Sequence, residues 1–254
     1  MQQSNTYVII FSAVLTIVLG GLLSMANQGL KPKQQRSIEL DTKKKILGSV
    51  TDLGKKKGQE VLDFYKETIE SSVYDIEGNI IETDEKGAQI IAENVNIAKN
   101  FKKPAEQRLY PVFIYHAPGN KEAIEAYILP VFGKGLWGPI YGFVALDTDL
   151  NTIKGISLDH DKETPGLGAR ITGKDIQARY VGKKIFNESG NLVSVSMLKG
   201  ESNTQEALDA HHIDGMSGAT ITGKGVNNML LDYFGYYQKF MEKKGTATNK
   251  VASL

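Results

Sequence analysis

The longest apolar stretch of the sequence runs from Tyr7 to Met25 and contains no charged residue. At about 1.5 Å of rise per residue, its roughly 19 residues nearly cross a hydrocarbon layer of about 30 Å. A cleaved signal peptide is the alternative, because Ser24-Met25-Ala26 resembles a small-x-small cleavage site. The run exceeds a signal h-region and no Lys or Arg precedes it, so we interpret residues 7–26 as a single transmembrane helix after a tail, residues 1–6.

A lysine-rich connector, residues 27–57, follows this span. Its basic residues near the span are Lys31, Lys33, Arg36, Lys43, Lys44 and Lys45. We interpret it as a solvated stalk or helix beside the membrane, with membrane lipid head groups as alternative contacts. By the positive-inside rule, these charges would leave the bulk of the chain in the cytoplasm.

Residues 58–109 predict a helix and hairpin region. Residues 58–72 place four apolar side chains on one helical face: Val61, Leu62, Tyr65 and Ile69. Residues 73–76 and 80–82 predict two strands around a turn at Gly78, and residues 88–100 predict a further helix.

Residues 110–245 predict a strand-rich domain that ends in a helix. The predicted strands are 111–117, 125–133, 140–149, 155–158, 184–186 and 192–197. Residues 226–241 repeat apolar side chains at three- and four-residue spacings, so we expect an amphipathic helix with its aromatic residues in the core. With a tail at 246–254, the predicted fold class is α+β: a single amino-terminal transmembrane helix followed by a mixed or antiparallel sheet domain with packed helices.

Composition narrows the chemistry. The 254 residues include no cysteine, which excludes thiolate nucleophiles, cysteine-ligated zinc and cysteinyl iron–sulfur clusters. Redox chemistry would therefore need a bound cofactor. A net charge of +1 without a basic arm gives no support to nucleic-acid binding. The adjacent His211 and His212 cannot converge on one ion from a helix, and we expect no metal site.

A glycine-flanked segment, Ser217–Gly223, precedes the last predicted helix, with Thr222 as the expected N-cap. Helix N-termini bind phosphate through unpaired N–H groups, but a capped turn that merely opens a core helix fits the same pattern. The segment also approaches a P-loop. Gly225 stands where that motif needs a Ser or Thr for magnesium, so nucleotide hydrolysis is disfavoured.

The segment Asp214-Gly-Met-Ser-Gly-Ala-Thr220 matches Asp-x-x-Ser-Gly-Ala-Thr, by which an FMN transferase recognises its targets and esterifies FMN to the threonine. Two further segments and the amino-terminal span strengthen the likeness: Gly135-Leu-Trp-Gly-Pro-Ile140 and Glu163-Thr-Pro-Gly-Leu-Gly168. The chain resembles the family of C subunits of sodium-translocating NADH:quinone oxidoreductases, which have a covalent FMN-binding domain, here residues 110–245. From sequence alone, the 135–140 segment is either a turn with Trp137 in the core or a loop that faces the flavin or a partner.

This resemblance implies a cofactor site but no catalytic residue. Covalent FMN would be on Thr220, with its phosphate near Ser217, Gly218, Ala219 and Lys224. The flavin pocket would be lined by Glu163, Thr164, Leu167 and Gly168, and Asp214 would serve recognition by the transferase. The family usually has a histidine one residue before the glutamate, whereas His160 is three residues away, so His160 is left out.

The resemblance also implies a role and a location. The chain would relay electrons from an iron centre to the flavin of the B subunit in a membrane complex that pumps sodium, with the B, D and E subunits as partners and no NADH or quinone site of its own. It would cross the bacterial inner membrane once, with the flavin domain on the periplasmic side, against the charge bias. The alternatives are the G subunit of an Rnf-type ferredoxin:NAD oxidoreductase and a non-redox membrane-tethered binding module.

Overall fold

The computed structural model describes residues 4–251. Contacts divide the chain into two units, Met1–Lys43 and Lys44–Leu254. In the first unit, helix α1 (Asn5–Gly48) begins and contains the predicted span. Within residues 4–251, it is the one helix that is long and apolar enough to cross a membrane. Helix α1 continues through Pro32 into the predicted connector, and the sequence-based division into six segments stays a prediction.

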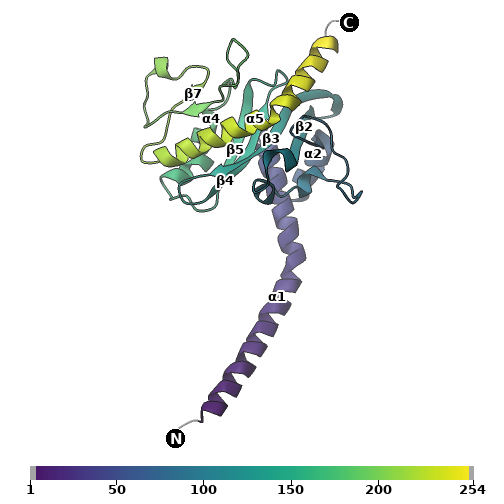
Figure 1. The fold of residues 1–254 in the computed structure, drawn as a ribbon, viewed down its shortest axis with the longest axis vertical. Coiled ribbons are helices and arrows are strands. Elements are labelled where there is room, and N and C mark those ends of the chain that lie inside the picture. The colour runs from purple at the N-terminus through teal and green to yellow at the C-terminus, as the bar shows by residue number, and fades with distance from the viewer. Residues whose placement is uncertain (1–3, 252–254) are drawn as a thin grey trace. The chain divides into compact units, whose positions relative to one another are not determined.

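The second unit, which contains the strands drawn as arrows in Figure 1, is built on an antiparallel sheet. This sheet has five strands, and strands that are consecutive in the chain are neighbours in it. Its strands are β1 (Ile69–Tyr74), β2 (Tyr110–Ala117), β3 (Asn120–Lys134), β4 (Pro139–Leu146) and β5 (Ile153–His160). The α+β class with an antiparallel sheet is confirmed, and the strands predicted within residues 110–158 correspond to β2, β3, β4 and β5. A smaller parallel pair joins β6 (Ser196–Met197) to β7 (His212–Ile213).

Two of the predicted helices are wrong in their extent. The predicted helix 58–72 ends early, because α2 covers only Gln59–Thr68 and Ile69 starts β1, which pairs with β2 from Ile69 opposite Tyr115. Sheet pairing therefore overrides the helical pattern in its last turn. The predicted helix 88–100 is reduced to a 3₁₀ turn η1 (Ala92–Asn94) and one helical turn α3 (Ile97–Asn100), which Asn96 caps by accepting from the Lys99 N–H at 2.9 Å. A second 3₁₀ turn, η2 (Ala105–Gln107), precedes β2.

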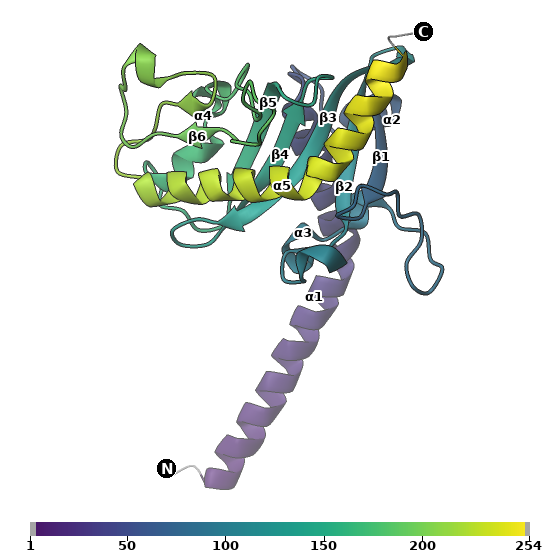
Figure 2. The same ribbon diagram turned by 45° about the horizontal axis from the view of Figure 1, so that its top comes forward.

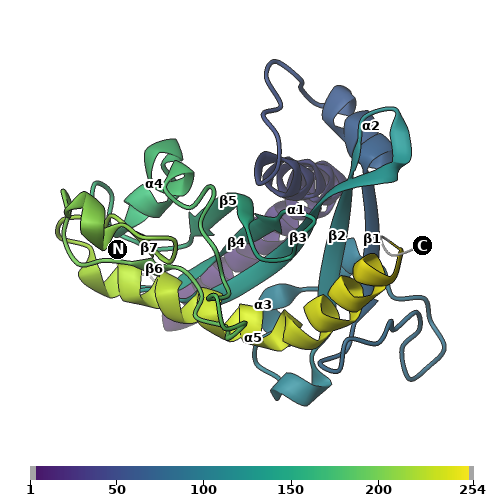
Figure 3. The same ribbon diagram turned by 90° about the horizontal axis from the view of Figure 1, so that it is seen from above.

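Helix α5 (Thr220–Val251) crosses one face of the sheet (Figure 2). The predicted aromatic stripe lies in the core, with Tyr233, Phe234, Tyr237 and Phe240 all buried. Burying side chains of this size contributes about 1.5–3 kcal/mol each. The Tyr237 hydroxyl donates to the Pro111 carbonyl at 2.8 Å, so the helix is also hydrogen-bonded to β2. Helix α2 lies on the opposite side of the sheet from α5 (Figure 3).

The chain between β5 and α5 is mostly loop and short helix. It contains the 3₁₀ helix η3 (Gly168–Thr172), helix α4 (Lys174–Ala178), β6, the 3₁₀ turn η4 (Gln205–Ala207) and β7. Phe186 and Leu192 form a single β-bridge, and the strand predicted at 192–197 is formed only at Ser196–Met197. This region brings the segments around Glu163 and Asp214 to the start of α5.

Glycine at position 225 is required by the packing of α5 against the end of β3. A Cβ on Gly225 would meet the Lys134 carbonyl oxygen and lie 3.3 Å from the Gly135 Cα. We expect Gly225→Ala to lower the free energy of unfolding by about 1–3 kcal/mol through overpacking. Gly235, in the same helix, is the matched control, because its Cβ would meet only the Leu192 side chain at 3.9 Å.

Gly235→Ala should leave stability unchanged or raise it by up to about 1 kcal/mol, since alanine favours a helix over glycine. Thermal unfolding of both variants in detergent measures the difference. Equal stability of the two variants would contradict the close approach at position 225.

Candidate functional site

Helix α5 begins at Thr220, which is half-buried. The first helical hydrogen bond runs from the Gly223 N–H to the Ala219 carbonyl at 2.9 Å, and Gly218 before it has φ 75°. The expected N-cap at Thr222 is therefore wrong. Thr222 lies in the first turn of the helix, and its side chain points into the protein, where the residue is only 1% exposed.

The hydroxyl of Thr222 donates to Glu163, the most deeply buried carboxylate of this region. The bond to Glu163 Oε2 is 2.5 Å, and the other oxygen, Oε1, accepts from the Trp137 backbone N–H at 2.9 Å. Glu163 is only 4% exposed. One carboxylate therefore joins the three segments that the sequence singled out, residues 135–140, 163–168 and 214–223.

Hydrogen bonds keep this buried carboxylate ionised. Burial alone would raise the pKa of Glu163, but the Thr222 hydroxyl and the backbone N–H groups of residues 136–138 outweigh it and hold the pKa below its ordinary value. The carboxylate is therefore an acceptor at neutral pH. Its contribution to stability is present above the ordinary glutamate pKa of about 4.3 and is lost as the pH falls through the lower, folded value.

Two glycines make room for Glu163. A Cβ on Gly135 would clash with Glu163 Oε1, and a Cβ on Gly168 would clash with Oε2 and with the Thr222 hydroxyl. Both glycines belong to the segments that carry the family resemblance. Their role in the structure is close packing around the carboxylate.

The segment 163–168 forms a turn in which the Thr164 carbonyl accepts from the N–H groups of Leu167 and Ala169, both at 3.1 Å. Thr164 and Leu167 are exposed, whereas Glu163 and Gly168 are buried. A Cβ on Gly218 would lie 2.8 Å from Leu167 Cδ2, so Leu167 lies against the loop before Thr220.

His160, which the predicted pocket omits, contacts this turn. Its ring Nδ1 accepts from the Glu163 backbone N–H at 3.2 Å. The alternative that places Trp137 in the core is wrong, because Trp137 is 64% exposed and only its backbone is held, by Glu163. Large exposed apolar side chains lie on all three joined segments: Leu136, Trp137, Leu167 and Ile221.

Asp214, at the start of the flavinylation-type sequence, is held within the chain. Its carboxylate accepts from the backbone N–H groups of Ser202 at 2.9 Å and Asn203 at 3.0 Å, and from the Asn203 amide at 2.7 Å. Burial would raise its pKa, but these bonds and the charge of Arg179 lower the pKa to about 2. Asp214 is therefore a charged, multiply bonded residue of the fold.

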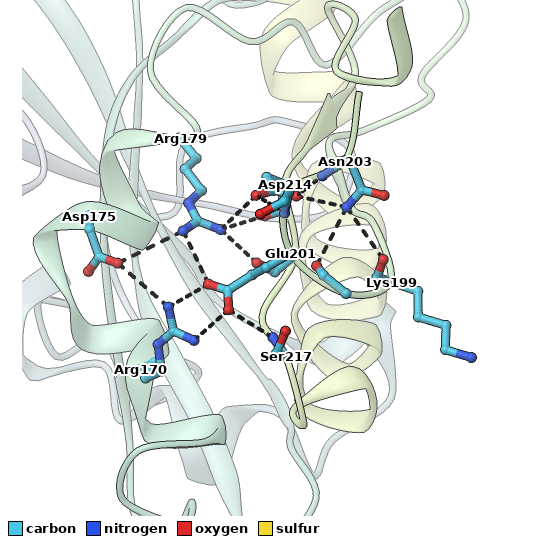
Figure 4. Close-up of polar contacts among 11 residues, drawn as sticks. Arg170, Asp175, Arg179, Lys199, Glu201, Asn203, Asp214 and Ser217 are labelled. Atoms are coloured by element: carbon cyan, nitrogen blue, oxygen red, sulfur yellow. Dashed lines mark hydrogen bonds and ion pairs between the residues drawn. The ribbon is translucent and has the colours of Figure 1, made fainter. Parts of the chain in front are cut away.

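Three charged residues outside the predicted site, Arg170, Arg179 and Glu201, lie around the loop between Asp214 and Ser217 (Figure 4). Arg170 donates to both oxygens of Glu201, at 3.0 and 2.5 Å, and Arg179 donates to Glu201 Oε1 at 3.5 Å. The Arg170 guanidinium lowers the pKa of Glu201 to about 2. No local sequence signal marks these residues, because the partners lie 22 and 31 positions apart in the chain.

The remaining predicted residues lie at the start of α5 or just before it. Ser217 and Gly218 are exposed, Ala219 is buried, and Lys224 is exposed one turn after Thr220, on the same helix face. His211 and His212 are bonded to the Lys184 carbonyl and to Asp209. In the described part of the chain, no group of three or more His, Asp or Glu side chains could hold a metal ion.

Comparison with known proteins places this site in a domain family. The FMN-binding domain family matches residues 135–234. The C subunit of Na⁺-translocating NADH-quinone reductase from Pseudomonas aeruginosa is 32% identical over 247 residues, covering 92% of this chain and 93% of that protein. The C subunit from Vibrio campbellii is 34% identical over 226 residues and 84% of each chain. The crystal structure of the C subunit from Parabacteroides distasonis is similar with a TM-score of 0.68 at 32% identity, covering 84% of this chain and 96% of that one.

The bond between Thr222 and Glu163 generates a stability prediction. Thr222→Val keeps the shape but leaves a buried carboxylate oxygen without its hydroxyl donor, so we expect a loss of about 1–3 kcal/mol in the free energy of unfolding. Thr222→Ser keeps the hydroxyl and should lose clearly less. Thermal unfolding at pH 7 compares the two variants, and an equal loss in both would show that the hydroxyl bond contributes little.

Proposed function

The chain belongs to the family of C subunits of Na⁺-translocating NADH-quinone reductase, and we propose that it carries FMN as a phosphoester on Thr220 and relays electrons within that complex. Membership of this family removes the Rnf-type G subunit and the non-redox binding module as alternatives. The chain is thus a subunit of an oxidoreductase complex, with an FMN-binding domain at residues 135–234.

The position of Thr220 is the observation that carries the proposal. Thr220 is the first residue of a 32-residue helix, and unpaired N–H groups and partial positive charge gather at such an end. Gly218 precedes it in a left-handed conformation, and Lys224 follows one turn later on the same face. These features suit a phosphate monoanion esterified to the Thr220 hydroxyl.

The residues around Thr220 also fit a flavin ring. Thr164 offers a hydroxyl donor, and Leu136, Trp137, Leu167 and Ile221 expose apolar surface. We propose that Thr164 and Leu167 contact the ring, while Glu163 and Gly168 shape the site from beneath because both are buried. When bound, FMN supplies reversible electron transfer, for which this chain itself has no group.

Attachment of FMN is a group transfer at Thr220. The Thr220 Oγ1–phosphorus bond forms and the phosphoanhydride bond of a flavin dinucleotide donor breaks. The nucleoside monophosphate leaves, the hydroxyl proton passes to a base, and no electron changes hands. We propose an FMN transferase as the catalyst, since the 214–220 segment matches its recognition sequence.

The partners follow from the proposed role. We propose that the chain accepts electrons from an iron centre in the membrane, passes each one on to the B subunit, and contacts the D and E subunits. A relay of this kind needs no acid–base pair. Glu163 is consistent with that role. Its lowered pKa and its hydrogen bonds keep it an ionised hydrogen-bond acceptor that does not exchange a proton.

Covalent attachment generates the first test of the proposal. Intact mass of the wild-type chain, co-expressed with the transferase, should exceed the sequence mass by one FMN less one water. Thr220→Val should show the sequence mass alone. Thr172→Val is the matched control, because Thr172 is an exposed threonine of η3 outside the site, and it should carry FMN like the wild type. FMN retained on Thr220→Val, or absent from the wild type, contradicts the assignment.

The second test concerns location. We propose that α1 crosses the bacterial inner membrane once and that the second unit lies on the periplasmic side, although basic residues follow the span. Alkaline phosphatase fused after Leu254, which is active only outside the cytoplasm, should be active in whole cells. This orientation would be overturned if alkaline phosphatase after Leu254 is inactive and a reporter that works only in the cytoplasm is active at the same position.

A further inference from the structure

The loop that leads to Thr220, residues 214–219, is held by charged side chains from outside it; we call it the acceptor loop. Arg170 comes from η3 and Arg179 from the end of α4, and both guanidinium groups point toward Glu201 (Figure 4). Glu201 lies in the turn that follows β6. The three side chains are only partly exposed, at 31%, 23% and 25% for Arg170, Arg179 and Glu201.

Three of their hydrogen bonds go to the backbone of the acceptor loop. Arg179 Nη1 donates to the Asp214 carbonyl at 3.1 Å and to the Gly215 carbonyl at 2.6 Å. The Ser217 N–H donates to Glu201 Oε2 at 3.3 Å. Backbone groups on both sides of Met216 are therefore fixed by side chains that are distant in sequence.

The first two residues of the loop are fixed from the other side as well. The Asp214 carboxylate accepts from the Ser202 N–H, and Ser202 has φ 64°, a conformation that few non-glycine residues adopt. A Cβ on Gly215 would clash with the carbonyl oxygens of Leu198 and Gly200. Asp214 and Gly215 therefore pack the acceptor loop against the turn that carries Glu201.

This cluster is not a phosphate site. Two guanidinium groups, of Arg170 and Arg179, face three carboxylates, those of Asp175, Glu201 and Asp214, so the local net charge is −1. Both terminal nitrogens of the Arg170 guanidinium already donate to Glu201. Arg179 bonds the loop backbone directly, and Arg170 holds Glu201, which accepts from the Ser217 N–H of the loop.

We propose that Arg170, Arg179 and Glu201 form a clamp that positions the acceptor loop, and with it the Thr220 hydroxyl, for attachment of FMN. The inference rests on the proposed function and extends the determinants of attachment to three residues outside the 214–220 segment. It also gives Asp214 an intramolecular task, since its carboxylate holds the turn from which Glu201 reaches the loop. None of the three clamp residues touches the reacting atoms; each is a positioning residue.

The test measures the rate of attachment on the full-length chain. Apoprotein in detergent, purified transferase and flavin adenine dinucleotide are mixed, and intact mass gives initial rates over a range of apoprotein concentrations. Glu201→Ala should lower the limiting rate by on the order of tenfold or more, because a misplaced nucleophile slows the step itself. Glu125→Ala is the matched control. Glu125 is a partly exposed carboxylate on β3 that pairs with Lys154, and the rate of this variant should equal that of the wild type.

Hydrogen exchange supplies a readout that does not depend on FMN. In the Glu201→Ala apoprotein, amides of residues 214–219 should exchange faster, whereas those of β2 and β3 should not change. If Glu201→Ala does not fold, Arg179→Lys decides with the same measurements. Lysine keeps the charge but loses the planar guanidinium, whose Nη1 donates to the carbonyls of Asp214 and Gly215.

The outcomes separate the two proposals. Failure of the wild-type chain to take up FMN would refute the proposed function. The clamp alone would be overturned if the wild type takes up FMN and the folded clamp variant, Glu201→Ala or Arg179→Lys, has a limiting rate within about twofold of the wild-type rate. A change confined to the KM for apoprotein would also overturn it, since that result assigns Glu201 to recognition by the transferase.

Discussion

The candidate site depends on one buried carboxylate, that of Glu163. Its oxygens accept from the Thr222 hydroxyl of α5 and from the Trp137 N–H of the loop between β3 and β4. An ionised group in such a place is tolerated only when its hydrogen bonds are made, so the three segments cannot move apart without leaving it unpaired. The position of Thr220, two residues before Thr222, follows from this constraint.

Close backbone packing makes the constraint possible. Gly135 and Gly168 leave room for the carboxylate, and Gly225 lets α5 approach the end of β3. On the far side of Thr220, the acceptor loop is held by Arg179 and Glu201. Thr220 therefore lies between two fixed regions, and the same rigidity suits both a covalent attachment point and a relay whose cofactor must keep one place.

Sequence patterns predicted the parts of this arrangement that depend on local periodicity. The strands β2 to β5, which are bounded by Gly, Pro, Asn and Asp turn signals, and the apolar stripe of α5 follow directly from side-chain order. The N-cap at Thr222 was wrong because the local pattern is equally compatible with a hydroxyl that turns inward to a partner 59 residues away. The sequence did not predict the cluster of Arg170, Arg179 and Glu201 either. Charged residues are common on protein surfaces, and only the tertiary fold brings these three together.

The most direct test of the central role of Glu163 is a double-mutant cycle with Thr222. Unfolding free energies of the wild type, Glu163→Gln, Thr222→Val and the double variant give the coupling between the two side chains. If the carboxylate joins the segments as described, the coupling should be about 1–3 kcal/mol, and all three variants should attach FMN more slowly than the wild type. Losses that add within about 0.5 kcal/mol, with FMN attachment unchanged in each variant, would contradict the central role of Glu163.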